Sequence, residues 1–379
     1  MEANNIYLDY NATTPVDTSV LSAMMPYFNE KFGNASSKTH RYGWIAADAV
    51  NLARSQVADL INAEPSEIIF TSGATEAINQ ALQGIFEKYS TKGNHIVTVS
   101  TEHKAVLDTC RHLETKGAEI TFLNVNQQGV INPGELADSI KPTTILVCIM
   151  LANNETGVIQ DINAISKIVH QRNCLLMTDA TQAVGKIKVD VQEQGIDILT
   201  MSAHKIYGPK GVGALFIRRK NPRVAMAPLL YGGGHENGLR SGTLNVPGIV
   251  GLGQASRIAL NELEQYGKEM STLRDLLESE FAGHKNVGIN GAGALRLPNT
   301  SNICFKGMNQ TELINRLRGM AVATGSACTS ALPEPSHVLL AMGLSEKDAY
   351  TSIRFSLGKY TTASDINYVV EKIKLLLTG

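Results

Sequence analysis

The sequence predicts an α/β protein, with a large domain built on a mostly parallel seven-stranded sheet and a smaller C-terminal α+β domain. From about residue 66 to residue 218, short apolar and β-branched runs alternate with helical patterns. Nearly continuous apolar strands separated by helices are typical of a parallel sheet that is covered on both faces. Beyond residue 250 this alternation stops. A length of 379 residues also suggests two domains rather than one.

The predicted elements follow in order along the chain. Seven runs are predicted strands of the sheet, at 67–71, 95–99, 119–123, 144–149, 175–177, 196–201 and 213–217. A glycine-rich stretch at 231–238 precedes a long helix over roughly 250–281, a strand at 302–305 and helices at 310–319 and 364–377. We expect the large domain to span 16–255 and the small domain to combine 1–15 with 256–379.

Composition argues against several classes of protein. The 34 basic and 35 acidic residues give a net charge of −1, without the basic footprint of a nucleic-acid binder. The N-terminus has no signal-peptide character, and the longest apolar stretch, 145–152, is too short to span a membrane. The five cysteines show no CxxC pair and no zinc spacing, so we expect no metal and no disulfide framework. A cytoplasmic location fits this cysteine usage best.

Two predicted strands lead into a carboxylate and an amine. The run 175–177 precedes Asp179, and the run 196–201 precedes Lys205. Parallel strands place such residues at the carboxyl edge of the sheet, where ligands bind. A lysine beside an aspartate in a dry crevice suggests pyridoxal phosphate, with a Schiff base on the lysine and the aspartate at the ring nitrogen. Taken alone, the lysine is also compatible with a solvated charge, and the aspartate with a helix N-cap.

Other strand ends carry further candidate residues. The segment 71–76 joins a glycine turn to a helix start, which favours a phosphate site, although an ordinary capped helix has the same pattern. His103 could stack on a planar ring and transfer protons, or make a structural hydrogen bond. Asn154 could bind an oxygen atom or form part of a turn. Arg354 lies in an apolar context, where it could grip a substrate carboxylate or an internal one.

A run of small residues at 325–330 surrounds Cys328, and prolines follow at 333 and 335. This composition predicts a surface loop, where a cysteine is a liability unless it reacts. The remaining four cysteines lie in apolar or helical runs, and we expect them in the core. They are Cys110, Cys148, Cys174 and Cys304.

Alternative sites lack their sequence signatures. The glycine-rich segments contain no GxGxxG, so a nicotinamide site lacks its fingerprint. Gly185-Lys186 lacks the upstream glycine and the following serine or threonine of a nucleotide-binding P-loop. His235-Glu236 has no second histidine for a zinc protease.

With these residues assembled, the chain resembles the cysteine desulfurases of the NifS/IscS type, within the class V aminotransferase family. The resemblance runs nearly end to end and implies an aspartate-aminotransferase-like fold of type I. It rests on the segments 7–15, 32–34, 71–76, 101–106, 153–157, 179–182, 202–213, 240–243, 325–330 and 352–358.

The resemblance implies a role for each candidate residue. Lys205 would hold pyridoxal 5'-phosphate covalently, His103 would stack on its ring and transfer protons, and Cys328 would be the nucleophile. Asp179 would pair with the ring nitrogen and Gln182 with the ring oxygen. The phosphate would be bound by Ala74, Thr75, Ser202 and His204, and by Thr243 of a neighbouring subunit in a homodimer. Asn34, Asn154 and Arg354 would hold the substrate, with Asn154 also near the cofactor.

The implied reaction converts L-cysteine to L-alanine and leaves a persulfide on Cys328 for delivery to a protein acceptor. Iron–sulfur cluster assembly, tRNA thiolation and DNA sulfur modification are all compatible destinations. Ala35 replaces a proline that the family often has, and the sequence ends at Gly379, before the longer tail of housekeeping members. That ending puts docking of their iron–sulfur scaffold in doubt. A selenocysteine lyase or an aminotransferase on the same scaffold, and a catalytically silent partner-binding protein, are the alternatives.

Overall fold

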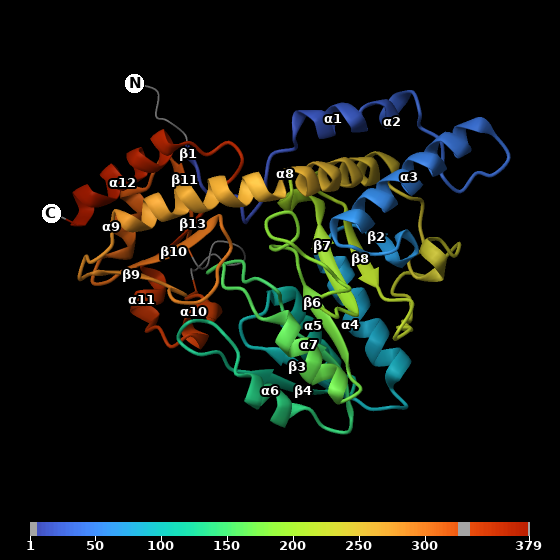
Figure 1. Ribbon diagram of the computed structural model, residues 1–379, viewed down its shortest axis with the longest axis horizontal. Helices are drawn as coiled ribbons and strands as arrows, with labels where there is room; N and C mark the ends of the chain where they lie inside the picture. Colours follow the sequence, from blue (N-terminus) through green and yellow to red (C-terminus); the bar gives the residue numbers. More distant parts are fainter. Residues whose placement is uncertain (1–5, 325–333, 378–379) are drawn as a thin grey trace.

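The computed structural model describes residues 6–324 and 334–377, and a seven-stranded sheet organises the larger part of the molecule (Figure 1). Its order is β2-β8-β7-β6-β5-β3-β4, in which β8 runs antiparallel to both of its neighbours and the strands from β7 to β4 are mutually parallel. The strands are β2 (Ile68–Thr71), β3 (His95–Val99), β4 (Glu119–Leu123), β5 (Thr144–Cys148), β6 (Leu175–Asp179), β7 (Ile198–Ser202) and β8 (Gly213–Ile217).

Helices cover both faces of this sheet because most of its strands are buried on both sides. One hydrophobic cluster joins the sheet to α4 (Ala74–Tyr89) and α5 (Lys104–Glu114). A second cluster joins it to the helices on the other face. These are α3 (Arg41–Leu60), α6 (Pro133–Ser139), α7 (Ile162–Gln171) and the first half of α8 (Val246–Ser279).

A second, antiparallel sheet of order β12-β13-β10-β9 forms the smaller part. Its strands are β9 (Val287–Ile289), β10 (Thr300–Phe305), β12 (Ala323–Thr324) and β13 (Ser352–Ser356). The N-terminal strand β1 (Ile6–Tyr7) pairs with β11 (Met320–Ala321) beside it, so the first residues of the chain pack with the last third. The helices of this part are α9 (Gln310–Arg316), α10 (His337–Ala341), α11 (Glu346–Tyr350) and α12 (Ala363–Leu377).

Helix α8 connects the two parts and runs across the molecule in Figure 1. Its N-terminal residues pack into the core of the large sheet, whereas Met270 and Leu277 pack into a separate core with α12 and the small sheet. The predicted boundary at 255/256 therefore lies inside one continuous helix, and the division into two domains stays a prediction.

The helices before the first sheet strand were not predicted from the sequence. They are α1 (Thr18–Met24), α2 (Pro26–Asn29) and α3. In α3, the buried face consists largely of alanine and valine, which contrast weakly with the exposed side and give little periodic signal. Among the described helices, none combines the length and the apolar character that crossing a bilayer requires.

Candidate active site

The carboxyl ends of β6 and β7 open into a cavity of about 610 Å³. Strand β6 ends at Asp179, and β7 ends at Ser202 before a 3₁₀ turn, Ala203–Lys205. Asp179 and Lys205 line this one cavity, as predicted from the two strand ends. The volume lies within the range of small-molecule sites.

Lys205 is held by main-chain carbonyl groups from the other end of the chain. Its Nζ donates to the carbonyl oxygens of Asn11, at 2.6 Å, and Ala12, at 2.7 Å. Thr14 forms two hydrogen bonds to the same turn. Its N–H donates to His204 O at 2.9 Å, and its Oγ1 accepts from Tyr207 N at 2.9 Å. Tyr207 has a φ of 64°, a left-handed conformation that these surrounding contacts must hold in place. The amine is therefore positioned by a rigid turn.

Asp179 is almost completely buried, and one of its oxygens is already satisfied within the protein. Its Oδ1 accepts from Thr181 N at 3.0 Å and from Thr200 Oγ1 at 3.3 Å. Among the described residues nothing bonds its second oxygen, and Asp179 lines the cavity. Nearby, burial raises the pKa of Glu102 well above its ordinary value, and the Asp179 carboxylate adds to this. Burial thus favours the neutral form of Glu102 over its carboxylate.

The two histidines of the cavity are neutral at pH 7. Desolvation lowers the pKa of His103, an effect that Asp179 opposes and Lys205 reinforces. His103 Nδ1 accepts from Ala105 N at 3.1 Å, where it caps α5. Burial, with Lys205 and Lys210 beside it, lowers the pKa of His204 to about 4. Neutral imidazoles can accept protons at physiological pH.

The start of α4 lines the cavity as a candidate anion site. Gly73, with a φ of 154°, turns the chain into the helix, and no side chain of the described residues caps the first helical N–H groups. Ala74 and Thr75 line the cavity there. The free N–H groups of the first helical turn and the positive end of the helix dipole therefore lie at the cavity wall. Glu76 also lines this wall, but Arg240 Nε donates to its carboxylate at 2.9 Å and offsets its charge.

Arg354, on β13, reaches the cavity from the small sheet. Its Nη2 pairs with Asp9 Oδ1 at 2.5 Å, and its Nη1 donates to the carbonyl oxygen of Asn154 at 3.0 Å. Of the two predicted partners, the internal carboxylate is the one that the structure contains. Among the described residues nothing bonds its Nε, which is a buried donor without a partner.

These groups match the chemistry of pyridoxal phosphate. Nine of the ten residues predicted to bind it line the cavity, namely Ala74, Thr75, His103, Asn154, Asp179, Gln182, Ser202, His204 and Lys205. The free N–H groups of α4 suit a phosphate, and the open oxygen of Asp179 suits a protonated ring nitrogen. The donor set thus fits the cofactor from end to end.

Two of the predicted residues lie elsewhere. Asn34 and Thr243 are exposed and do not line this cavity in the single chain. Cys328 falls outside the described residues. The other four cysteines are buried, as predicted.

The sequence reasoning assigned no role to several residues of the site. Asn11 and Ala12 hold Lys205 through main-chain carbonyl groups, which leave no side-chain signature. Glu76 and Arg240 form an ion pair between segments far apart in the sequence. Lys186 lies inside an apolar run, 183–187, and that unusual setting is the signal that could have identified it.

Comparison with known proteins gives the class. The sequence model of the aminotransferase class-V family matches residues 6–369. The chain therefore belongs to this family, whose members are pyridoxal-phosphate enzymes.

Individual relatives narrow the assignment. The "Cysteine desulfurase IscS" of Neisseria meningitidis serogroup C is 50% identical over 369 residues, which cover 97% of this chain and 91% of the relative. A solved "NifS-like protein" superposes with a TM-score of 0.91 at 40% identity, over 99% of both chains. The structure named "SspA in complex with cysteine" has a TM-score of 0.83 at 36% identity, over 94% of this chain and 100% of the other. Within its family, the chain belongs with the cysteine desulfurases of the NifS/IscS type.

Proposed function

We propose that this enzyme uses pyridoxal 5'-phosphate to convert L-cysteine to L-alanine and passes the sulfur to Cys328 as a persulfide. The observation that carries this is the meeting of Lys205, Asp179, the free start of α4 and Arg354 around one cavity. An amine, a carboxylate, an anion site and a guanidinium are the groups needed to hold the cofactor and the carboxylate of an amino acid.

Each residue has a defined task. The bound cofactor, attached to Lys205, supplies an electron-withdrawing ring that acidifies the α-carbon of the amino acid. Asp179 would keep the ring nitrogen protonated, and Gln182 would donate to the ring oxygen. Ala74, Thr75, Ser202 and His204 would hold the phosphate, and the neutral imidazole of His204 would add no charge there. His103 would take part in proton transfer at the ring.

Sulfur transfer needs a nucleophile that can reach the substrate. The Cys328 thiolate bonds to the substrate sulfur, the carbon–sulfur bond breaks, and the carbon fragment takes up a proton and leaves as alanine. The segments on either side of 325–333 are anchored beside the cavity. Strand β12 pairs with β13 at Arg354, and His337 Nε2 donates to the carbonyl oxygen of Glu102 at 3.0 Å.

The proposal includes a homodimer and a protein acceptor for the sulfur. Asn34 and Thr243 are exposed in the single chain, as expected if they complete the site of a second subunit, with Thr243 at its phosphate. Apolar side chains lie exposed on the adjoining N-terminal helices and loops, at Leu21, Met25, Phe28, Phe32, Tyr42 and Trp44. Such a patch on α1–α3 suits a subunit interface. The cytoplasmic location stays a prediction from cysteine usage.

Replacing Cys328 tests the reaction. Purified Cys328→Ala should bind the cofactor and cysteine, but should form neither alanine nor a protein persulfide detectable by intact-protein mass spectrometry. Cys174→Ala removes a buried cysteine instead and should react like the parent. Alanine formation by Cys328→Ala at the parental rate would exclude Cys328 as the nucleophile. Turnover of selenocysteine or of an amino-acid/keto-acid pair, without turnover of cysteine, would favour the alternative activities.

A further inference from the structure

Lys186 is a buried lysine behind the proposed cofactor site, and the mechanism above gives it no task. Its residue is 3% exposed. Its Nζ donates to Gln182 Oε1 at 2.7 Å and to Asn11 Oδ1 at 2.9 Å. Within the described part of the chain, no carboxylate lies within ion-pair distance of it. A lysine is rarely buried without such a partner, because desolvation of an ammonium group is costly.

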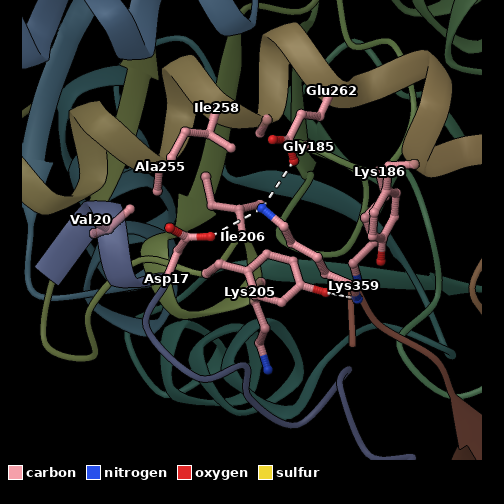
Figure 2. A pocket seen from close by; sticks show the side chains of 13 residues that line it. Asp17, Val20, Gly185, Lys186, Lys205, Ile206, Ala255, Ile258, Glu262 and Lys359 are labelled. Carbon is pink, nitrogen blue, oxygen red and sulfur yellow. Dashed lines mark hydrogen bonds and ion pairs between the residues drawn. The ribbon is translucent and has the colours of Figure 1, made fainter. Parts of the chain in front are cut away.

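The electrostatic surroundings of Lys186 are also unfavourable to a positive charge. Burial lowers the pKa of Lys186 well below its ordinary value, and the cations Lys205 and Arg354 lower it further. On its other side, Lys186 and Lys205 both line a small cavity of about 30 Å³ (Figure 2). The titratable groups of that cavity include Asp17, Glu262, Tyr207, Tyr266 and Lys359. Both of its carboxylates are paired with Lys359, not with Lys186.

The contact with Gln182 fixes which end of that amide faces each neighbour. An amide has one acceptor oxygen and two N–H donors. Lys186 occupies the oxygen, and Gln182 Nε2 donates to Asn11 O at 3.0 Å. The reversed amide would place its oxygen against Asn11 O and its nitrogen against the amine of Lys186. Both contacts would then be lost, so the hydrogen-bond network allows one orientation. That orientation leaves the second N–H of Gln182 for the cavity.

The contact with Asn11 links Lys186 to the amine of Lys205. The side chain of Asn11 accepts from Lys186 Nζ and from Asn299 Nδ2, at 3.2 Å. Its main-chain oxygen accepts from both Lys205 Nζ and Gln182 Nε2. Fixing Asn11 therefore fixes the carbonyl group that holds the amine and the amide together.

We propose that Lys186 is a positioning residue that holds Gln182 with an N–H directed at the cofactor's ring oxygen and holds Asn11 beside Lys205. The inference rests on the proposed function, because it presupposes that cofactor. An N–H donor stabilises the anionic ring oxygen and so favours the less protonated form of the lysine-bound chromophore. Loss of the donor should therefore raise the pH at which the chromophore titrates.

The test is a pH titration of the visible absorption of cofactor-loaded protein without substrate. In Lys186→Met, the midpoint should rise by about one pH unit, the tenfold change expected from one hydrogen bond to a charged group. Lys188→Met is the matched control, because that lysine is exposed and pairs with Glu193 on the surface. It should titrate like the parent. Thermal unfolding of each cofactor-free protein checks that the variants are folded.

A second comparison separates hydrogen bonding from charge. Lys186→Gln removes the charge but keeps an N–H donor, so its chromophore should titrate close to that of the parent. If Lys186→Met does not fold, the midpoint of Lys186→Gln still tests the inference. In a Gln182→Leu background, Lys186→Met should cause no further shift, because the amide through which it acts is absent.

Three results would overturn the inference: an unshifted midpoint in Lys186→Met, a full shift in Lys186→Gln, or a full additional shift in the Gln182→Leu background. Failure of the proposed function looks different. The parent protein itself would then show no visible band after loading with pyridoxal phosphate.

Discussion

Replacing Arg354 with lysine should weaken binding of cysteine without changing the chemical step. The variant keeps the positive charge and a partner for Asp9, but it loses the planar fork and the buried Nε donor that the structure leaves unpaired. One hydrogen bond to a charged group is worth about 1.5–3 kcal/mol. At 1.4 kcal/mol per factor of ten, KM for cysteine should rise roughly 10- to 100-fold. Because the proposed carboxylate contact would be the same before and during reaction, kcat should stay near the parental value.

The chain offers a closely matched control for this substitution. Arg296 is 11% exposed and pairs with Glu278 through both terminal nitrogens, at 2.7 and 2.8 Å, whereas Arg354 is 12% exposed. Arg296 does not line the cavity. Steady-state alanine formation should therefore give a parental KM for Arg296→Lys. A KM for Arg354→Lys within threefold of the parent, or an equal rise in both variants, would refute the assignment.

Two further predictions follow from the pKa shifts. His103→Gln should lower kcat by about 10²- to 10⁴-fold, as for loss of a general base. Because the pKa of His103 is lowered, its imidazole stays neutral at pH values below the ordinary histidine pKa. The acid limb of the pH profile of kcat should therefore lie below pH ~6.5 in the parent enzyme. The variant should lack this limb. An unchanged acid limb would exclude this role. The second prediction concerns Lys359, which forms ion pairs with Asp17, at 3.1 Å, and with Glu262, at 3.2 Å (Figure 2). Loss of both pairs in Lys359→Met should lower the free energy of unfolding by roughly 1 kcal/mol and Tm by about 2 °C. Burial raises the pKa of Asp17, but hydrogen bonds from Ser19 and Lys359 have the larger effect, so the pKa is lowered overall. The Tm difference between parent and variant should therefore persist at neutral pH and shrink below about pH 4, where Asp17 becomes protonated. A difference that grows in acid would contradict this explanation.

The parts of the site that the sequence predicts are those that local chain geometry determines. Apolar runs indicate where β6 and β7 lie, and the carboxyl ends of parallel strands meet at one edge. Asp179 and Lys205 could therefore be paired before their contacts were known. The glycine turn before α4 has the same local character, because a free helix start needs only a few consecutive residues.

The parts that the sequence does not predict depend on contacts between distant segments. Alternation along a strand says nothing of its direction, so the antiparallel placement of β8 between β2 and β7 could not be inferred. Arg354 was compatible with two kinds of carboxylate, and only the fold brings Asp9, 345 residues away, against it. The carbonyl groups that hold Lys205 are invisible for the same reason.

Asn11 explains why the N-terminal segment belongs to the site although it precedes every strand of the large sheet. Its main-chain oxygen holds Lys205 and Gln182, and its side chain bonds Lys186, Asn299 and Thr300. Two of these partners come from the turn after β6 and two from the start of β10 in the small sheet. A carbonyl oxygen holds the catalytic amine without a full negative charge, whereas a carboxylate there would stabilise the ammonium form. The segment thus joins the two parts of the molecule at the amine of Lys205.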